Sequence, residues 1–340
     1  MKCRHCNLDC DRAFLDLGSH PPSNSYLSFE ELQDDEQKFP LRLRFCPNCY
    51  LVQTEDYVAK EIFFNEEYAY YSSVSKSWLR HAEAYTKKIC ERLNLSSNSF
   101  VVELASNDGY LLRNFITREI KCLGVEPAIG AAAVAQKNGI NTITDFFCTD
   151  LSHKILFEFG SADLIVGNNV YAHVPDINDF TKGIEILLSS EGVVSLEFPH
   201  LLKLIEYCQF DTIYHEHFSY LSLMTVCKIF NAHGLRVFDV EELATHGGSL
   251  RVYGCRAAGN WETSMAVLEI INKEKAFGIH ERKIYSNFQK NADKLKNELT
   301  QFLLEVNSSN KLIVGYGAAA KGNTLLNYAG VKKSQLPMIL

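Results

Sequence analysis

The stretch that decides the fold is "SFVVELASNDGYLLRNF", residues 99–115. It begins with apolar and β-branched residues that favour a strand ending at Glu103, then turns through Ser-Asn-Asp-Gly and continues into a helical pattern. Similar alternation recurs downstream. We therefore expect an α/β fold in which a parallel sheet is covered by helices on both faces and binds its ligand at the carboxyl ends of the strands.

Strand and helix patterns alternate regularly between residues 121 and 200. "KCLGVEP" (121–127), "NTITDFF" (141–147), "ADLIVGNNV" (162–170) and "GVVSLEFPH" (192–200) predict further strands, and residues 128–139 and 176–190 predict helices. Beyond them, residues 222–234 predict a helix, and residues 235–243 and 248–257 predict two strands that complete the sheet. Upstream, the spacing of Trp78, Leu79, Ala82, Tyr85 and Ile89 predicts a helix before the first strand.

Composition limits the classes of function. The chain has 340 residues, of which 46% are hydrophobic and 22% charged, so two or three globular domains are expected. A net charge of -7 provides no long-range attraction to nucleic acid or anionic lipid, so neither is an expected partner. No apolar run approaches the roughly 20 residues that span a bilayer, and "MKCRHCNLDC" lacks a signal-peptide core. We expect a cytoplasmic protein.

Two C-x-x-C pairs, "CRHC" and "CPNC", lie on either side of residues 7–45. Each pair presents two thiolates from a tight turn, and two pairs complete the tetrahedral four-sulfur shell of a structural zinc site. The alternative is four thiols grouped by chance. The expected zinc ligands are Cys3, Cys6, Cys46 and Cys49.

The first loop of the sheet indicates the type of cofactor. It contains Asn107, Asp108 and Gly109 but no G-x-G-x-x-G, so it lacks the glycines that let backbone approach a pyrophosphate. Glu126 ends the second strand, where an acidic residue takes two ribose hydroxyls. These features favour S-adenosylmethionine over a dinucleotide.

The stretch "DTIYHEHFSY", residues 211–220, combines a tyrosine, two histidines and a glutamate. His215 and His217 have the i, i+2 spacing of an H-x-H metal site, whereas the same residues also suit acid–base chemistry on a loop. Two interpretations of Arg251 stay open: it binds a phosphate of the ligand, or it is an ordinary surface charge. Near the end, Gly315 and Gly317 form G-x-G ahead of Lys321 and Asn323, an arrangement that suits a diphosphate.

Taken together, the motifs resemble those of a known enzyme family. "CRHC…CPNC", "EYAYYSS", "VELASNDGYLL", "GVEPA", "NNVYAHVPD", "DTIYHEHFSYLS", "HGGSLRVY" and "GYGAAAKGNTLLNY" follow one another as in the S-adenosylmethionine-dependent sugar C-methyltransferases that act on nucleotide-activated 4-keto deoxysugars. The resemblance covers nearly the whole chain. It implies a zinc-binding lobe at 1–65, a Rossmann-like class I methyltransferase domain at 66–260, and a helical linker with the start of a nucleotide-sugar-binding domain at 261–340.

The resemblance also implies a reaction, C-methylation at C-3 of a 4-keto sugar, with a thymidine diphosphate sugar as the expected substrate. A base must remove the proton next to the ketone while donors stabilise the enolate oxygen. We expect His217 to be the base and Glu216 to orient its ring, with His173 or Tyr214 as a donor. The expected catalytic residues are His217, Glu216, Tyr214 and His173, with Tyr70 or Tyr68 closing the pocket.

Other residues follow from the same resemblance. The expected cofactor-binding residues are Glu103, Ala105, Ser106, Asn107, Asp108, Gly109, Glu126, Asn168 and Asn169, and the expected substrate-binding residues are Arg251, Lys321 and Asn323. Family members continue with further strands after the last motif, so we expect an incomplete C-terminal Rossmann-like domain. Two alternatives are a small-molecule O- or N-methyltransferase and a non-catalytic S-adenosylmethionine-binding protein.

Overall fold

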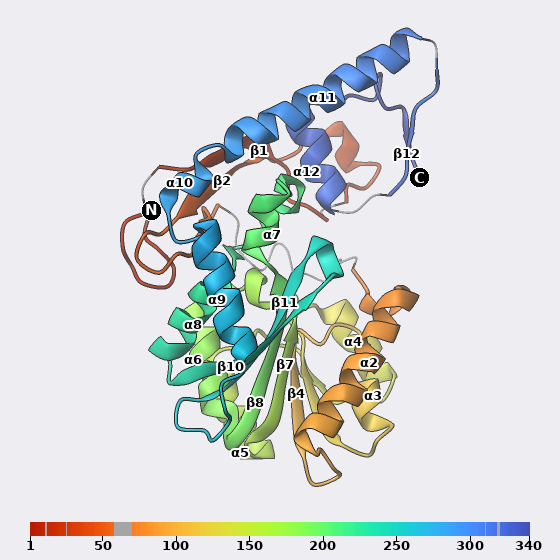
Figure 1. Ribbon diagram of the computed structural model, residues 1–340. Coiled ribbons are helices and arrows are strands. Elements are labelled where there is room, and N and C mark those ends of the chain that lie inside the picture. The colour runs from red at the N-terminus through yellow and green to blue at the C-terminus, as the bar shows by residue number, and fades with distance from the viewer. Residues whose placement is uncertain (11, 25, 58–69, 310, 318–319) are drawn as a thin grey trace. The chain divides into compact units, whose positions relative to one another are not determined.

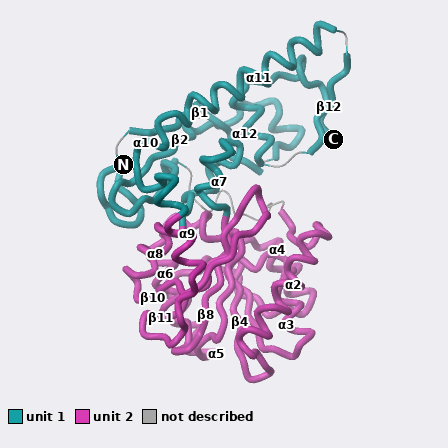
Figure 2. Tube along the Cα trace, viewed as in Figure 1, with its two compact units in different colours: residues 1–63, 199–222, 273–340 teal, residues 64–198, 223–272 magenta. Residues whose placement is uncertain are grey.

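The computed structural model of the chain describes residues 1–10, 12–24, 26–57, 70–309, 311–317 and 320–340 (Figure 1). The chain forms two compact units, coloured separately in Figure 2. Unit 1 comprises residues 1–63, 199–222 and 273–340, and unit 2 comprises residues 64–198 and 223–272. The division of the chain into three sequential domains stays a prediction.

Unit 2 is built on a seven-stranded sheet with the order β10-β11-β8-β7-β4-β5-β6. The central strands pair in parallel, whereas β10 and β11 are antiparallel to each other. Strand order reverses between β4 and β7, and a parallel sheet binds its ligands at such a switch point. The strands are β4 (Phe100–Leu104), β5 (Lys121–Val125), β6 (Thr142–Ile143), β7 (Ala162–Asn168), β8 (Leu188–Pro199), β10 (Leu235–Leu243) and β11 (Ser249–Arg256).

The predicted helices of unit 2 are confirmed, and one unpredicted helix joins them. The helices are α2 (Lys76–Leu93), α3 (Arg113–Ile116), α4 (Ile129–Lys137), α5 (Thr149–Phe159), α6 (Ile177–Leu187) and α8 (Leu223–Ala232). The sequence prediction left residues 148–161 unassigned, although α5 buries Leu151 and Ile155 at i, i+4 spacing. Cys148 caps this helix without a side-chain hydrogen bond, so the usual start signal is absent.

The helix α2 shows how the sequence determines packing in this unit. Ser75 caps its N-terminus by accepting from the Trp78 amide, and Asn94 ends it in the left-handed conformation. Ala82, Tyr85 and Ile89 are buried at helical spacing. Together with Phe115 and residues of β4 and β7 they form one apolar core.

Unit 1 contains a second sheet, with the order β1-β2-β3-β9. Its strands are β1 (Leu15–His20), β2 (Phe39–Phe45), β3 (Val52–Thr54) and β9 (Ser219–Tyr220). The strand β9 comes from a distant part of the sequence and pairs antiparallel with β3. The segment that precedes β9 is thereby attached to the cysteine-rich lobe.

Helices from two later segments of the chain complete unit 1. The segment 199–222 provides α7 (Leu201–Glu206), and the last segment provides α10 (Arg282–Tyr285), α11 (Phe288–Ser308) and α12 (Ala320–Ala329), while α9 (Met265–Phe277) leads out of unit 2. Tyr285 and Phe288 are buried against Leu15 and Leu43 of the lobe. The short strands β12 (Val314–Gly315) and β13 (Met338–Ile339) pair in parallel. Within the described part of the chain, no helix is long and apolar enough to cross a membrane.

The core of unit 2 generates a stability prediction. Phe115 is fully buried, whereas Phe157 on α5 is 95% exposed. We expect Phe115→Ala to lower the free energy of unfolding by about 3–5 kcal/mol, because it removes buried apolar surface and leaves a cavity. Phe157→Ala is the matched control, and its expected effect is within about 0.5 kcal/mol. Urea denaturation followed by circular dichroism measures both, and equal stabilities would contradict the assignment of the core.

Candidate functional site

Glu103 is the last polar group on the central strand β4, and it is 1% exposed. Neither oxygen of its carboxyl group has a hydrogen-bond partner among the residues that the structure describes. Burial, together with the nearby Glu126 and Asp108 carboxyl groups, raises its pKa well above the ordinary value. A buried acid of this kind can accept hydrogen bonds from a ligand or from water.

The loop after β4 has an unusual backbone. Ala105, Asn107 and Gly109 have φ values of 55°, 50° and 78°, which lie in the left-handed region. A side chain at Gly109 would place its Cβ 1.9 Å from Cδ1 of Ile140, so glycine is required there. The Asn107 side chain holds the preceding segment by accepting from the Ser72 amide and donating to the Tyr70 carbonyl.

Glu126 follows the end of β5 and closes this loop from the other side. Its two carboxyl oxygens accept from the Asn107 and Ala128 amides, each at 2.8 Å. Burial raises its pKa to about 7, against the effect of these two hydrogen bonds. Each carboxyl oxygen retains a lone pair, so the group still suits the two ribose hydroxyls expected from its position.

The polar atoms at this edge of the sheet fit S-adenosylmethionine. At this edge, the buried carboxyl and amide oxygens without a partner among the described residues are Glu103 Oε1 and Oε2, Asp108 Oδ1, Asn168 Oδ1 and Asn169 Oδ1. S-adenosylmethionine presents an ammonium group, hydroxyls and an amine, all of which donate. A diphosphate presents only acceptors and negative charge, so it does not match an edge with three acids. Ser106, whose Oγ is also buried, packs its side chain against Gly124.

Two further predicted residues belong to unit 2. His173 ends the short 3-10 helix η3 (Tyr171–His173) that follows β7, so it lies on the same edge of the sheet as Asn168. Tyr70 is 50% exposed, and its carbonyl is held by Asn107. Tyr68 lies outside the described residues.

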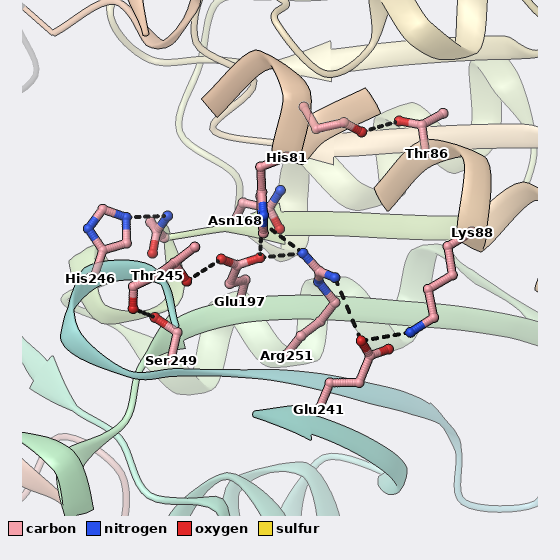
Figure 3. Close-up of polar contacts among 12 residues, drawn as sticks. His81, Thr86, Lys88, Asn168, Glu197, Glu241, Thr245, His246, Ser249 and Arg251 are labelled. Atoms are coloured by element: carbon pink, nitrogen blue, oxygen red, sulfur yellow. Dashed lines mark hydrogen bonds and ion pairs between the residues drawn. The ribbon is translucent and has the colours of Figure 1, made fainter. Parts of the chain in front are cut away.

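A buried ion-pair network lies at the end of β8, and sequence analysis missed its centre, Glu197 (Figure 3). One carboxyl oxygen of Glu197 accepts from Arg251 Nη2 at 2.6 Å and from His81 Nε2 at 3.0 Å. The other accepts from the Thr245 hydroxyl at 3.0 Å. Burial raises the pKa of Glu197, but the contacts with His81 and Arg251 outweigh it and keep the pKa below the ordinary value.

Arg251 is therefore not surface charge, and that alternative was wrong. Its side chain is 4% exposed, and its guanidinium lies 4.5 Å above the Tyr85 ring. The guanidinium also lies 4.0 Å from Glu241, which in turn pairs with Lys88 (Figure 3). A guanidinium already neutralised by a buried carboxylate is poorly suited to bind a phosphate. The substrate-binding role of Arg251 stays a prediction without structural support.

A sequence signal for Glu197 did exist. Glu103, Glu126 and Glu197 all stand at the carboxyl ends of apolar strands, and the same pattern that selected the first two also selects the third. His81 gave a weaker signal, because only its i+3 spacing from Trp78 on α2 places the two rings together, 4.8 Å apart and stacked.

Unit 1 carries the other predicted catalytic residues on the loop before β9. The Nδ1 atom of His217 lies 3.0 Å from the Thr212 carbonyl oxygen. A carbonyl only accepts, so Nδ1 holds the hydrogen, and in the neutral ring Nε2 holds the lone pair. The Tyr214 ring packs against that of His217 at a centroid distance of 4.0 Å. The loop therefore presents the histidine in a tautomer suited to a base.

We expected Glu216 to orient the His217 ring, but the Thr212 carbonyl does so. The Oε1 atom of Glu216 accepts instead from Asn24 Nδ2 at 2.9 Å and from Ser23 Oγ at 3.1 Å. Burial raises the pKa of Glu216 to about 7, and the two hydrogen bonds partly offset this rise. The carboxyl group thus titrates near neutral pH.

The two histidines of the H-x-H pattern bind different backbone carbonyls. His215 Nε2 donates to the carbonyls of Phe39 and Pro40, each at 3.2 Å, whereas His217 Nδ1 donates to the carbonyl of Thr212. Burial lowers the pKa of His215 and favours its neutral form. His215 therefore anchors the loop to β2.

The four predicted zinc ligands come together in unit 1. Their sulfur atoms all lie within 4.8 Å of one another, with 3.4 Å between Cys3 and Cys49 and between Cys6 and Cys46. A tetrahedral zinc with Zn–S bonds of about 2.3 Å holds its sulfurs at about 3.8 Å, so the cluster fits zinc. Each C-x-x-C turn is followed by a residue in the left-handed conformation, Asn7 or Tyr50. The zinc is structural, because four thiolates leave no open position.

The zinc lobe also holds residues 211–218, the loop that carries the predicted catalytic residues. Cys46 and Cys49 form the turn between β2 and β3, and β3 pairs directly with β9. Thr54 contacts the loop twice, because its hydroxyl donates to the His217 carbonyl at 3.1 Å and its amide donates to the Phe218 carbonyl at 3.2 Å.

Lys321 and Asn323 lie in the first turn of α12, which packs on the same loop. Thr324 Oγ1 donates to the Ile213 carbonyl at 2.8 Å. Burial raises the pKa of Asp211, against a smaller lowering by the charge of Lys321. The side chain of Asn323 accepts from Asn327. The start of α12 and residues 211–213 are thus neighbours within unit 1.

Comparison with known proteins gives matches over nearly the whole chain. Family models match as a zinc binding domain at residues 3–64, a methyltransferase domain at 78–240 and a C-methyltransferase C-terminal domain at 244–340. The C-methyltransferase NovU of Streptomyces niveus is 33% identical over 335 residues, which are 98% of this chain and 80% of that protein.

Solved structures match over about half of the chain. The PH0226 protein of Pyrococcus horikoshii is 13% identical with a TM-score of 0.46, covering 55% of this chain and 94% of that chain. Magnesium protoporphyrin IX methyltransferase of Synechocystis, with bound S-adenosylmethionine, is 14% identical with a TM-score of 0.40, covering 52% of this chain and 79% of that chain.

The zinc lobe generates a prediction about the loop that it holds. Cys46→Ala removes one thiolate, so we expect loss of zinc and at least about tenfold faster amide hydrogen exchange in Val52–Thr54 and Ser219–Tyr220, because β3 and β9 lose their anchor. Exchange in β4 and β7 should stay unchanged. Cys122→Ala in unit 2 is the control and should retain zinc. Unchanged exchange in β9 after zinc loss would contradict the scaffold role.

The Glu197 network generates a prediction about stability. Arg251→Met leaves the Glu197 carboxylate buried without its cation, and we expect a loss of about 3–5 kcal/mol in the free energy of unfolding. Adding Glu197→Gln to this variant should restore most of the lost stability. Lys88→Met, at the exposed end of the network, should lower the free energy of unfolding by at most about 1 kcal/mol. Because the Glu197 pKa is lowered, the wild-type advantage should be present at neutral pH and disappear as acid protonates the group. Urea denaturation at several pH values measures this, and additive single effects would contradict the pairing.

Proposed function

Because the chain belongs to the S-adenosylmethionine-dependent C-methyltransferase family, we propose that it methylates C-3 of a nucleotide-activated 4-keto deoxysugar. The observation that carries this proposal is the hydrogen bond from His217 Nδ1 to the Thr212 carbonyl. It leaves Nε2 as the basic nitrogen of a histidine, which is the group that a carbon acid next to a ketone requires.

The proposed reaction begins at the carbon next to the ketone. His217 Nε2 takes the proton as the C–H bond breaks, and the electron pair moves onto the ketone oxygen to give an enolate. When bound, S-adenosylmethionine would supply the electrophilic methyl group. The enolate carbon forms the new C–C bond as the S–CH3 bond breaks, S-adenosylhomocysteine is the leaving group, and the ketone re-forms. His173 or Tyr214 donates a hydrogen bond to the enolate oxygen, which is where negative charge accumulates.

The cofactor would be held by unit 2. Glu126, whose oxygens each accept one backbone amide, would accept also from the ribose hydroxyls. Glu103 or Asp108 would accept from the ammonium group, since both oxygens of Glu103 and Oδ1 of Asp108 lack a donor among the described residues. Asn168 and Asn169 offer further acceptors at the end of β7. Tyr70 is the proposed pocket-closing residue, because Asn107 ties its backbone to the cofactor loop.

The nucleotide part of the substrate is proposed to be thymidine diphosphate. Lys321 brings positive charge to the first turn of α12, and an α-helix N-terminus attracts phosphate. Thr324 ties this helix to Ile213, next to the catalytic loop. A diphosphate at α12 would therefore leave the attached sugar near residues 214–217.

The test uses a thymidine-diphospho-4-keto-2,6-dideoxyhexose in deuterated water, with and without S-adenosylmethionine, followed by mass spectrometry. We expect a gain of one methyl group on carbon with the cofactor present. Without it, we expect deuterium uptake next to the ketone, because proton removal precedes transfer. His217→Ala should reduce both by at least about 100-fold.

The control is His153→Ala, which changes an exposed histidine on α5 and should leave both rates unchanged. Methyl transfer to oxygen, or full activity in His217→Ala, would overturn the proposed reaction. Fragmentation of the product distinguishes methylation at C-3 from methylation elsewhere on the sugar.

A further inference from the structure

The carboxyl group of Glu216 is held in an asymmetric way. Asn24 Nδ2 and Ser23 Oγ both donate to Oε1, at 2.9 and 3.1 Å. Among the residues that the structure describes, no hydrogen bond reaches Oε2. The residue is 2% exposed, so a single oxygen of a buried acid receives two donors from the zinc lobe.

The segment that supplies these donors has a restricted backbone. It reads His-Pro-Pro-Ser-Asn, residues 20–24, and starts at the last residue of β1; Pro21 and Pro22 fix their own φ angles. The buried His20 ring donates to the Leu17 carbonyl at 2.9 Å, and Ser23 is 3% exposed. Asn24 has a φ of 62°, a left-handed conformation that asparagine tolerates. The prolines and these contacts therefore limit the conformations of the segment that carries both donors.

Among the described residues, no ion pair involves Glu216. Burial raises its pKa, and the hydrogen bonds from the neutral side chains of Asn24 and Ser23 partly offset the rise. Its own loop also carries the titratable residues Tyr214, His215 and His217, and His20 of the lobe interacts with His215; burial favours the neutral forms of His20 and His215. In the protonated acid, Oε1 is the carbonyl oxygen that accepts two hydrogen bonds and Oε2 carries the hydrogen.

We propose that Ser23 and Asn24 are positioning residues for methyl transfer: by holding Oε1 they fix Glu216 with its protonated Oε2 as a hydrogen-bond donor to the substrate oxygen that becomes negative. A carboxylic acid kept neutral near pH 7 stabilises an oxyanion better than water does, because its donor is fixed in advance. This inference rests on the proposed function, since it assumes an enolate. No bond to Glu216 forms or breaks in this role.

The experiment compares wild type, Glu216→Gln, the double variant Ser23→Ala/Asn24→Ala, and Ser28→Ala as a matched control on the exposed part of the lobe. For the double variant we expect kcat to fall about tenfold while KM changes less than about twofold, because misplacement affects the transition state more than binding. The alkaline limb of the kcat profile should move to higher pH, because the lost hydrogen bonds favoured the carboxylate. Glu216→Gln should abolish that limb.

The outcomes separate this inference from the proposed function. If Glu216→Gln impairs transfer while the double variant keeps the wild-type kcat and pH profile, the positioning role of Ser23 and Asn24 is wrong and the reaction stands. If the test sugar is not methylated, the proposed substrate fails, and carbon-13 NMR of the glutamate carboxyls still measures the Glu216 titration. An unchanged Glu216 pKa in the double variant then overturns the inference. Zinc content and thermal unfolding confirm that each variant is folded.

Discussion

The pairing of β3 with β9 is the contact that ties residues 211–218, the loop that carries His217, to the zinc lobe. Only Val52 with Tyr220 and Gln53 with Ser219 are paired, and a ladder of two residues has little stability alone. It persists because Cys46 and Cys49 tie the turn that leads into β3 to the zinc. A slip of one residue would turn every side chain of β9 to the opposite face and displace His217, which stands two residues before the strand.

The second unit shows how one sheet edge gives similar acids opposite properties. Glu103, Glu126 and Glu197 all stand at the ends of apolar strands. Burial and neighbouring carboxyl groups raise the pKa of the first two, whereas His81 and Arg251 keep the pKa of Glu197 low. Glu197 is thus a fixed charge that holds α2 and β11 together, and the other two remain available for hydrogen-bond donors of a ligand.

Local patterns predicted the parts of the molecule that depend on neighbouring residues. The strand ends at Glu103 and Glu126, the helix α2 and the two C-x-x-C turns were all accessible from spacing. The contacts of Glu216 with Ser23 and Asn24 were not, because they join residues more than 190 positions apart and no local pattern encodes such a pairing. Arg251 was misread for the same reason, since its partner Glu197 lies on another strand.

The lobe that binds zinc also supplies the hydrogen-bond donors to Glu216. Burial raises the pKa of this carboxyl group to about 7, and Ser23 and Asn24, which donate to its Oε1, partly offset the rise. Two contributions stabilise the lobe: Leu15 and Leu43 pack in one core with Tyr285 and Phe288, and a four-thiolate zinc site contributes roughly 10 kcal/mol or more to folding. Under the proposed function, the metal therefore acts on the chemistry through geometry, because it stabilises the lobe whose two neutral donors position the acid.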